Sequence, residues 1–267
     1  MNNLNMFCLC IHDGLYSKIK SLNYIPVGLG KEIYNKDWLR DNTFNNISKK
    51  NSHYGEYTFH YWFWKNRLMK IDNNVWTGFC AYRRFWLKKD VEPLKIIDLN
   101  NDVLKEVPDD WEKFDTILGT KIDLTNLKFM KLIKYGKTSL LRNPKALIKS
   151  GRSIRFQFDM FHGNGVLDKA IDLLEEKDRK DFKIFVNENN SYNQGNMFIC
   201  RSKEIMNDYY ITIFDWLNKC ENLFGFDRKS YGTTRIYAFL AERFLPYWFN
   251  KYTKTKEWPI AFYDTTK

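Results

Sequence analysis

The chain has 267 residues, of which 44% are hydrophobic and 17% aromatic, so it can bury a large core and lies near the upper size of one compact domain. Its formal net charge of +11 predicts a surface that attracts anions such as nucleic acid, acidic lipid head groups or phosphorylated small molecules. No apolar run reaches about 18 residues, which argues against a membrane-spanning helix, and the N-terminus lacks the pattern of a signal peptide.

The cysteines and histidines fit no common metal or disulfide pattern. The five cysteines include no CxxC pair, and their odd number argues against a disulfide framework and favours a reducing compartment. The four histidines show no HExxH or paired Cys/His spacing, so no zinc site is expected. We therefore expect a cytoplasmic protein, either soluble or peripheral at the inner face of the cytoplasmic membrane.

Two short apolar segments open the chain. Residues 5–11 predict a buried strand that ends in a His-Asp-Gly turn at residues 12–14. This arrangement is typical of the first strand of an α/β nucleotide-binding sheet, and an ordinary core strand would look the same. Residues 24–30 predict a second strand ending in Gly28 and Gly30, without a GxGxxG or Walker motif.

A helix is predicted over residues 53–68. Asn51 can cap it, and Glu56 in its first turn suits the positive end of the helix dipole. Aromatic residues repeat at steps of three and four and form a stripe that we expect to face the core: Tyr54, Tyr57, Tyr61 and Trp64. Packing explains Glu56, Lys65 and Asn66 less well, so these three are candidates for binding.

A buried strand over residues 75–82 follows the helix. Both of its faces are largely apolar, which predicts a central position in a sheet. Arg83 and Arg84 come directly after its carboxyl end, where open α/β sheets bind their ligands. Two guanidinium groups there would bind phosphate oxygens, whereas the alternative is a surface pair that only forms ion pairs.

The middle of the chain is basic. Residues 95–100 and 114–120 predict further strands, with Asp115 before an apolar pair. A run of basic residues without an acidic one lies between Leu124 and Phe158, and part of it would share one helical face: Lys128, Lys131 and Lys134. This face could contact an acidic membrane surface or another polyanion, and a solvated loop fits equally well.

Residues 156–165 carry Asp159 and His162 among aromatic residues and glycines. We predict a mobile loop here, whose His and carboxylate suit acid–base chemistry or hydroxyl binding, although a simple turn is an equal alternative. An amphipathic helix over residues 166–182 should follow.

The last part of the chain predicts one more strand and two helices. The strand covers residues 195–201, and the helices cover 203–220 and 235–249. Pro246 should break the second helix, which also carries Glu242 and Arg243. Without internal repeats or low-complexity linkers, the whole pattern predicts an α/β fold: a Rossmann-type central sheet flanked by helices, with inserted loops.

Five segments carry a more specific likeness, in this order: Asn46-Ile-Ser-Lys-Lys-Asn51, Glu56-Tyr-Thr-Phe-His-Tyr-Trp-Phe-Trp-Lys-Asn66, Gly78-Phe-Cys-Ala-Tyr-Arg-Arg-Phe85, Asn196-Met-Phe-Ile199 and Ala241-Glu-Arg243. Together they resemble a family of glycosyltransferases from capsular and exopolysaccharide loci, long catalogued as a domain of unknown function. The likeness spans nearly the whole chain. Its members usually carry His-Tyr-Arg-Arg where this chain has Ala81-Tyr82-Arg83-Arg84, so a catalytic role for that His does not carry over.

The resemblance implies one GT-A-like domain over residues 1–267, with nucleotide-sugar binding in residues 1–122 and acceptor binding in residues 123–267. It implies a hexosyltransferase-like enzyme that moves a sugar from a UDP-sugar to a growing surface polysaccharide or lipid-linked glycan. UDP-galactofuranose is among the candidate donors. The expected partners are therefore a nucleotide sugar and a glycan, with peripheral contact to an acidic membrane and without nucleic acid.

Metal use is a separate question. Many GT-A enzymes hold a divalent metal on an Asp-x-Asp motif at a strand end, and this sequence contains no such motif. Tyr82, Arg83 and Arg84 take that place in the pattern, so we expect the arginines to replace the metal and no cofactor to be needed. A divalent cation remains an alternative.

The candidate site residues fall into three groups. For donor binding they are His12, Gly28, Asn46, Ser48, Asn51, Glu56, Lys65, Asn66, Tyr82, Arg83 and Arg84. For acid–base catalysis they are Asp115, Asp159, His162 and Glu242, with Glu56 as a further candidate base, and for acceptor binding His162, Asn196 and Arg243.

Two other functions remain open. One is a nucleic-acid-binding protein, although no RNP1, zinc-finger or helix-turn-helix signature is present. The other is a carbohydrate-binding module without catalysis.

Overall fold

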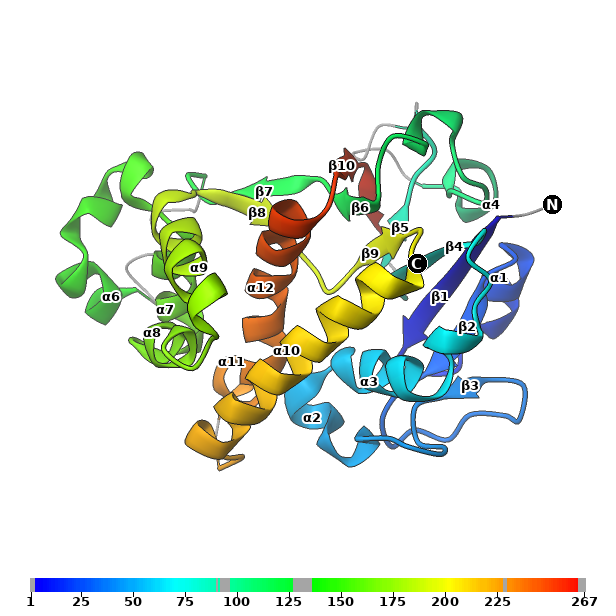
Figure 1. The fold of residues 1–267 in the computed structure, drawn as a ribbon, viewed down its shortest axis with the longest axis horizontal. Helices are drawn as coiled ribbons and strands as arrows, with labels where there is room; N and C mark the ends of the chain where they lie inside the picture. Colours follow the sequence, from blue (N-terminus) through cyan, green and yellow to red (C-terminus); the bar gives the residue numbers. More distant parts are fainter. Residues whose placement is uncertain (1–2, 90, 92–96, 127–135, 228–229, 264–267) are drawn as a thin grey trace. The chain divides into compact units, whose positions relative to one another are not determined.

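The computed structural model describes residues 3–89, 91, 97–126, 136–227 and 230–263 (Figure 1). They form two compact units. Unit 1 consists of residues 1–120, 195–211 and 249–267, and unit 2 of residues 121–194 and 212–248. The first crossing lies close to the predicted division at residue 122, but the chain later returns to unit 1, then to unit 2, and ends in unit 1.

Unit 1 is built on a mixed sheet with the strand order β10-β6-β9-β4-β1-β2-β3. Its strands are β1 (Leu4–Cys10), β2 (Ile25–Gly28), β3 (Leu39–Arg40), β4 (Trp76–Ala81), β6 (Thr116–Gly119), β9 (Phe198–Cys200) and β10 (Thr255–Trp258), with β5 (Arg84–Trp86) and β11 (Ile260–Phe262) paired beside β4. The run β4-β1-β2-β3 is parallel, and β9 is antiparallel to both β4 and β6. The predicted α/β fold with a central sheet is confirmed, and four parallel strands end at one edge.

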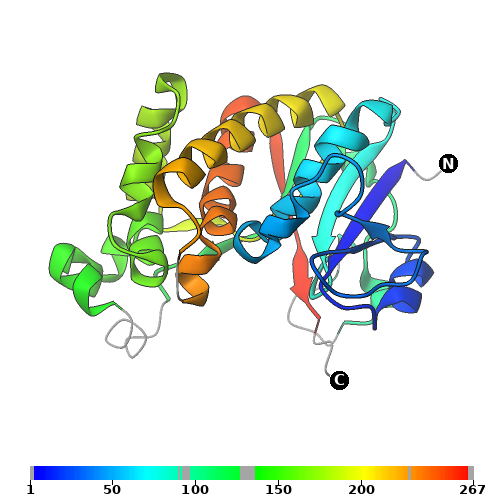
Figure 2. The same cartoon turned by 90° about the horizontal axis from the view of Figure 1, so that it is seen from below.

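The core of unit 1 lies around β1 and β4, both of which are buried on both faces. The ring of Phe7 in β1 lies 5.7 Å from that of Phe79 in β4, and 5.6 and 5.3 Å from those of Phe59 and Phe63. The last two rings belong to α3 (Tyr57–Asn66), which packs on this face of the sheet (Figure 2). Short apolar runs therefore predicted both strands to within one residue at each end.

The helix predicted over residues 53–68 is wrong in its extent. The chain forms a 3-10 turn η1 (Ser48–Lys50), then α2 (Asn51–Tyr54), α3 and a second 3-10 turn η2 (Leu68–Lys70). Gly55 separates the two helices with φ +54, a conformation that favours glycine. Asn51 begins α2 instead of capping a longer helix, because its amide donates to the Gly55 carbonyl at 3.0 Å.

The strand predicted over residues 95–100 is also wrong where it can be checked. Residues 95 and 96 lie outside the described ranges, and α4 (Leu99–Asp102) begins instead after Asp98, whose carboxylate caps the helix by accepting the Asn100 N–H at 2.9 Å. The strand predicted over residues 114–120 is confirmed as β6. The other helical elements of unit 1 are α1 (Tyr16–Ser21), between β1 and β2, and the 3-10 turn η3 (Asp109–Trp111), just before β6. The predicted basic face of Lys128, Lys131 and Lys134 lies outside the described residues.

Unit 2 is mainly helical. Its elements are β7 (Lys121–Asp123) paired with β8 (Ser191–Asn193), α6 (Lys137–Arg142), the 3-10 turns η4 (Pro144–Leu147) and η5 (Lys149–Gly151), α7 (Ile154–His162), α8 (Val166–Ile171), α9 (Glu176–Glu188) and α11 (Tyr231–Thr234). Two long helices, α10 (Lys203–Phe224) and α12 (Ile236–Tyr252), have residues in both units. Among the described residues, no helix is long and apolar enough to cross a membrane.

Three predictions about these helices are wrong. Residues 156–162 are helical instead of a mobile loop, because the Ser153 hydroxyl caps α7 by accepting the Phe156 N–H at 3.2 Å. The helix predicted over residues 166–182 is divided into α8 and α9, and the Arg179 side chain binds the Leu174 carbonyl between them at 2.8 Å. Finally, α12 continues through Pro246, and the adjacent residues Leu245 and Tyr247 are buried.

The buried His60 predicts a dependence of stability on pH. Its side chain is 0% exposed, with Nδ1 2.9 Å from the Tyr210 hydroxyl, and burial lowers the pKa of His60 to about 3. An unfolded His titrates near 6.5, so between about pH 6.5 and 3 the unfolded chain binds more protons than the native one. The contribution of His60 is therefore complete above pH 6.5 and is lost as the pH falls, by at most about 1.4 kcal/mol per pH unit.

Urea unfolding at pH 7 and pH 5 tests this expectation. In the His60→Gln variant the difference between the two unfolding free energies should be smaller than in the unchanged protein, whatever the variant's stability at pH 7. The His53→Gln variant is the control, because it leaves His60 in place. An unchanged difference in His60→Gln would contradict the expected protonation of a buried imidazole.

Candidate functional site

The carboxyl ends of the four parallel strands form one edge of the sheet in unit 1. His12 follows β1, Gly30 follows β2, Asp41 follows β3, and Tyr82 and Arg83 follow β4. Neighbouring strands lie about 4.8 Å apart, so this edge extends roughly 14 Å from β4 to β3. The rings of His12 and Tyr82 are 4.9 Å apart, so these two predicted donor-binding residues do lie together.

The two arginines lie at a tight turn between β4 and β5. Ala81 pairs with Arg84, which leaves Tyr82 and Arg83 at the tip of the hairpin. The Tyr82 N–H donates to the Leu9 carbonyl at 3.0 Å and so fixes the turn to the end of β1. Arg83 is exposed and its guanidinium lies 5.2 Å from the centre of the Tyr82 ring. Both arginines therefore follow the carboxyl end of a central strand, as the sequence predicts.

The chain entering β9 passes beside the arginine pair. Gly195 has φ +95, and a Cβ there would lie 3.5 Å from Arg84 Nη1. The carbonyl of the next residue, Asn196, lies 3.3 Å from Nε2 of the buried His60. Because β9 is antiparallel to β4, this segment lies at the same edge as Tyr82 and Arg83. Asn196, predicted for acceptor binding, is thus in the neighbourhood of the predicted donor residues.

A cavity of about 700 Å³ opens beside the ends of β2 and β3. Its lining includes Gly30, Lys31, Glu32, Ile33, Tyr34, Arg40, Asn42, Ser48 and Lys49. The Tyr34 hydroxyl donates to the Cys10 carbonyl at 2.8 Å, and the Arg40 guanidinium lies over the Tyr34 ring at 4.4 Å. The lining has three basic residues, Lys31, Arg40 and Lys49, and one acidic residue, Glu32, so the cavity has a net positive charge.

Gly28 has a steric role at this cavity. A Cβ at residue 28 would lie 2.8 Å from atoms of the Tyr34 ring, so a larger residue would displace the ring. The cavity residues Lys31, Tyr34, Arg40 and Lys49 were not predicted from the sequence. Only a weak indication of this cavity was available from the sequence, because Lys31 comes soon after the short strand β2 and Arg40 ends the short strand β3. That these two strands are paired is known only from the fold.

Asn46, Ser48 and Asn51 mainly support the backbone around this cavity. Asn46 Oδ1 accepts from the Ser48 N–H at 3.2 Å and from its hydroxyl at 2.9 Å. The Asn51 amide donates to the Thr58 hydroxyl at 3.0 Å, and Thr58 in turn donates to Asp41 at 2.5 Å. Asp41 is fully buried, and burial raises the pKa of its carboxyl. This chain of bonds connects the junction of α2 and α3 to the end of β3.

The three helix residues predicted for donor binding have other surroundings. The carbonyl of Glu56 accepts the Phe59 N–H at 3.0 Å at the start of α3. Lys65 Nζ lies 3.2 Å from the centre of the Trp64 ring, and burial lowers the pKa of Lys65. The Asn66 amide donates to the Asn45 carbonyl at 2.8 Å. Lys65 and Asn66 line a different cavity, of about 440 Å³, so they do not share the cavity that Ser48 lines.

Asp115 lies at the opposite edge of the sheet. It precedes β6, which runs in the same direction as β4 because both are antiparallel to β9. Its carboxylate accepts from Arg201 Nη2 at 2.8 Å and from the Lys254 N–H at 3.0 Å. The structure therefore does not bring Asp115 together with Arg83.

Three more predicted residues form a buried cluster in unit 2. Arg243, 1% exposed, pairs with Glu242, donates to the Gln157 side chain at 2.7 Å and lies 4.9 Å from the centre of the Tyr192 ring. His162 stacks on Phe239 at 3.9 Å, and burial together with the Arg243 charge lowers the pKa of His162 to about 3.

The buried cluster of Glu242, Arg243 and His162 is a poor candidate for direct contact with a substrate. Asp159, another of the predicted bases, lines a separate cavity in unit 2. Within the ranges that the structure describes, no group of three or more His, Cys, Asp or Glu side chains could hold a metal ion. Metal independence nevertheless stays a prediction.

Comparison with known proteins gives two similarities. The sequence model of a family described as a domain of unknown function, DUF4422, matches residues 7–254. The fold is similar to that of the apo structure of the WbbM bifunctional glycosyltransferase, with a TM-score of 0.68 and 19% identity over 99% of this chain. The chain spans 46% of that protein. No curated protein matches the sequence.

The contacts of Asn51 predict that its substitution acts on stability. Removing its amide in Asn51→Ala loses hydrogen bonds to Gly55 and Thr58 and should lower the unfolding free energy by about 1–3 kcal/mol. The exposed neighbour Ser52, changed to Ala, should have an effect within about 0.5 kcal/mol. Equal urea midpoints for the two variants would show that Asn51 has no supporting role.

Proposed function

The chain belongs to the DUF4422 family, whose sequence model matches residues 7–254. We propose that it is a glycosyltransferase that moves a sugar from a nucleotide-sugar donor to a glycan acceptor. The main support for this proposal is the cationic edge formed by the four parallel strands of the sheet, where Arg83 and Arg84 follow β4 and Arg40 ends β3, with β1 and β2 between these two strands. Ligands of open α/β sheets bind at the carboxyl ends of their strands. The glycosyltransferase named in the structural comparison has the same fold and gives further support.

The donor would bind along this edge. Its nucleotide suits the cavity beside β2 and β3, where the Tyr34 ring and the Arg40 guanidinium offer a stacking surface and hydrogen-bond donors. Its diphosphate would extend past His12 toward Arg83 and Arg84. A UDP-sugar is the donor class that we propose, with UDP-galactofuranose among the candidates, and the acceptor is a surface polysaccharide or a lipid-linked glycan.

The arginine pair would stabilise the leaving group. Breaking the bond to the sugar leaves negative charge on the nucleoside diphosphate, and fixed positive groups at that point lower the barrier. Arg83 and Arg84 hold two permanent charges at a hairpin that is anchored to β1 through Tyr82. Guanidinium groups bind phosphate oxygens in pairs of parallel bonds. We therefore propose that the arginines perform the task that a metal ion performs in many related folds.

An acceptor hydroxyl needs a base if the reaction inverts the sugar. Of the four residues predicted for acid–base catalysis, Asp159 best combines access and proton affinity, since it lines a cavity and burial raises the pKa of its carboxyl. Glu242 and His162 are buried in their own cluster, and both carboxylate oxygens of Asp115 already accept hydrogen bonds, one from Arg201 and one from the Lys254 N–H. Asp159 is therefore our proposed base.

Nucleotide-sugar binding tests the proposal through a panel of UDP-, GDP-, CMP- and dTDP-sugars measured by thermal shift. A ligand at about 100 times its dissociation constant should stabilise the protein by about 2.7 kcal/mol. In Arg83→Ala/Arg84→Ala the dissociation constant of the best ligand should rise roughly tenfold or more, because charge-assisted bonds are lost.

The exposed lysines in Lys20→Ala/Lys113→Ala remove equal charge elsewhere and should leave the affinity nearly unchanged. Equal losses in both double variants would indicate a general charge effect and contradict the site. Binding of oligonucleotides with steep salt dependence, in place of nucleotide sugars, would favour a nucleic-acid-binding protein. Binding of glycans without donor cleavage would favour a binding module.

Metal independence predicts that donor turnover survives a chelator. Sugar release or transfer measured in excess EDTA should stay within about twofold of the untreated rate, since the arginines carry their charge without a metal. A rate that collapses in EDTA and returns with Mn²⁺ or Mg²⁺ would contradict the arginine mechanism while leaving the donor site in place.

A further inference from the structure

Unit 2 contains a polar cavity of about 420 Å³, a size within the usual range of small-molecule sites. It lies among α6, η5, α7, α8 and α9, and its lining includes Arg142, Ser150, Arg155, Asp159, Asp168 and Asn187. Apart from Asp159, the proposed base, none of these residues takes part in the function proposed above.

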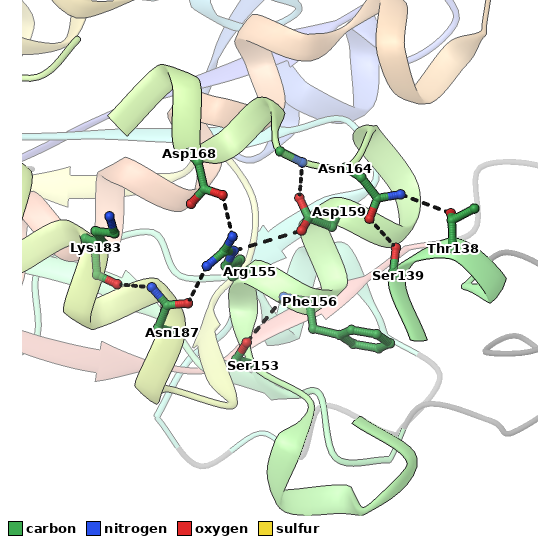
Figure 3. Close-up of polar contacts among 11 residues, drawn as sticks. Thr138, Ser139, Ser153, Arg155, Phe156, Asp159, Asn164, Asp168, Lys183 and Asn187 are labelled. Atoms are coloured by element: carbon green, nitrogen blue, oxygen red, sulfur yellow. Dashed lines mark hydrogen bonds and ion pairs between the residues drawn. The ribbon is translucent and has the colours of Figure 1, made fainter. Parts of the chain in front are cut away.

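Arg155 is the centre of a hydrogen-bond network on the wall of this cavity (Figure 3). One end of its guanidinium pairs with Asp168, and Nη1 donates to Asn187 Oδ1 at 3.3 Å. Its Nε lies 3.9 Å from Asp159 Oδ2. Acidic, amide and guanidinium groups from three helices therefore converge on one wall.

Hydrogen bonds to backbone groups hold two side chains of this network, Asp159 and Asn187, in place. The Gly165 N–H donates to Asp159 Oδ1 at 3.1 Å from a residue with φ +75, and the Asn187 amide donates to the Lys183 carbonyl at 2.7 Å (Figure 3). These bonds reduce the freedom of both side chains before a ligand arrives. A preorganised wall lowers the entropic cost of binding.

Two further cations line the cavity. Arg142 and Lys145 are exposed, and no hydrogen bond or ion pair connects their side chains to another residue in the described parts of the chain. They remain available as hydrogen-bond donors. With Arg155, they bring three positive charges near the two negative charges of Asp159 and Asp168.

This mixture of charges selects the kind of ligand. The three basic and two acidic residues leave the lining with a net charge of only +1, so it attracts a multiply charged anion less than the cavity beside β2 and β3, where three basic residues face one acidic residue. A sugar hydroxyl both donates and accepts hydrogen bonds, so it can use carboxylates, amides and guanidinium groups at once. A neutral, polyhydroxylated ligand fits this lining best.

We propose that this cavity binds a saccharide of the acceptor glycan, with Arg155, Asp168 and Asn187 as its main contacts. The inference rests on the proposed function, because it names the site for the acceptor of that reaction. Asp159, on the same wall, then lies where an acceptor hydroxyl would be held. Arg142 and Lys145 add donors for neighbouring hydroxyls.

Saccharide binding without any nucleotide sugar tests the proposal. Saturation-transfer NMR on the full chain would use methyl glycosides of galactose, glucose and mannose and their disaccharides, with galacturonate and inorganic phosphate as anionic comparisons. We expect at least one neutral saccharide to bind. Asp168→Asn should raise its dissociation constant about tenfold or more, because a charge-assisted hydrogen bond is lost.

Asp168→Asn also removes the ion pair with Arg155, so a second variant tests the cavity without changing any side chain of that network. Ser150 is exposed and lines the cavity, so Ser150→Trp should fill it and abolish saccharide binding without disturbing the Arg155 network. Lys180→Ala is the matched control, since its side chain is exposed on α9 and does not line the cavity, and it should bind as the unchanged protein does. Saccharide binding that survives both cavity variants would overturn the proposal.

The remaining outcomes separate this inference from the proposed function. If the unchanged protein binds nucleotide sugars but no saccharide, or only the anions, the saccharide site is wrong and the transferase proposal stands. If it binds a neutral saccharide that Ser150→Trp abolishes, but no nucleotide sugar, the site stands as a glycan-binding site and the transferase proposal is wrong.

Discussion

The buried pairing of β1 with β4 is the constraint on which the rest of unit 1 depends. Residues Leu4 to Leu9 pair in parallel with Trp76 to Ala81, and the rings of Phe7 and Phe79 stack between them and α3. Burying each such ring contributes roughly 1.5–3 kcal/mol, so a slip in this register would be costly. The fixed register puts His12 beside Tyr82 and aims the hairpin with Arg83 at the sheet edge.

This constraint also explains how much could be predicted from the sequence. The two central strands were predicted closely because their side chains are apolar on both faces. The same position made Arg83 and Arg84 notable, since charged residues directly after a buried strand need an explanation. By contrast, the cavity beside β2 and β3 depends on which short strands lie next to one another, and no local pattern contains that information.

The errors in the helices have local physical causes. The φ of +54 at Gly55 ends a helix whose aromatic periodicity continues beyond it. Ser153 caps a helix across a segment whose glycines suggested a loop, and those glycines only form its end. Arg243 looked like a substrate contact, yet its guanidinium is buried against Glu242, Gln157 and Tyr192 and supports the interior of unit 2. Residue type alone could not separate a buried support from a binding group.

A crystal structure with the best-binding nucleotide sugar, or its nucleoside diphosphate, would measure the position of the donor diphosphate directly. We expect phosphate oxygens within about 2.7–3.2 Å of guanidinium nitrogens of Arg83 or Arg84, with the nucleotide beside Tyr34. A diphosphate bound elsewhere, or held at this edge by a metal ion on carboxylates with the arginines turned away, would contradict this expectation.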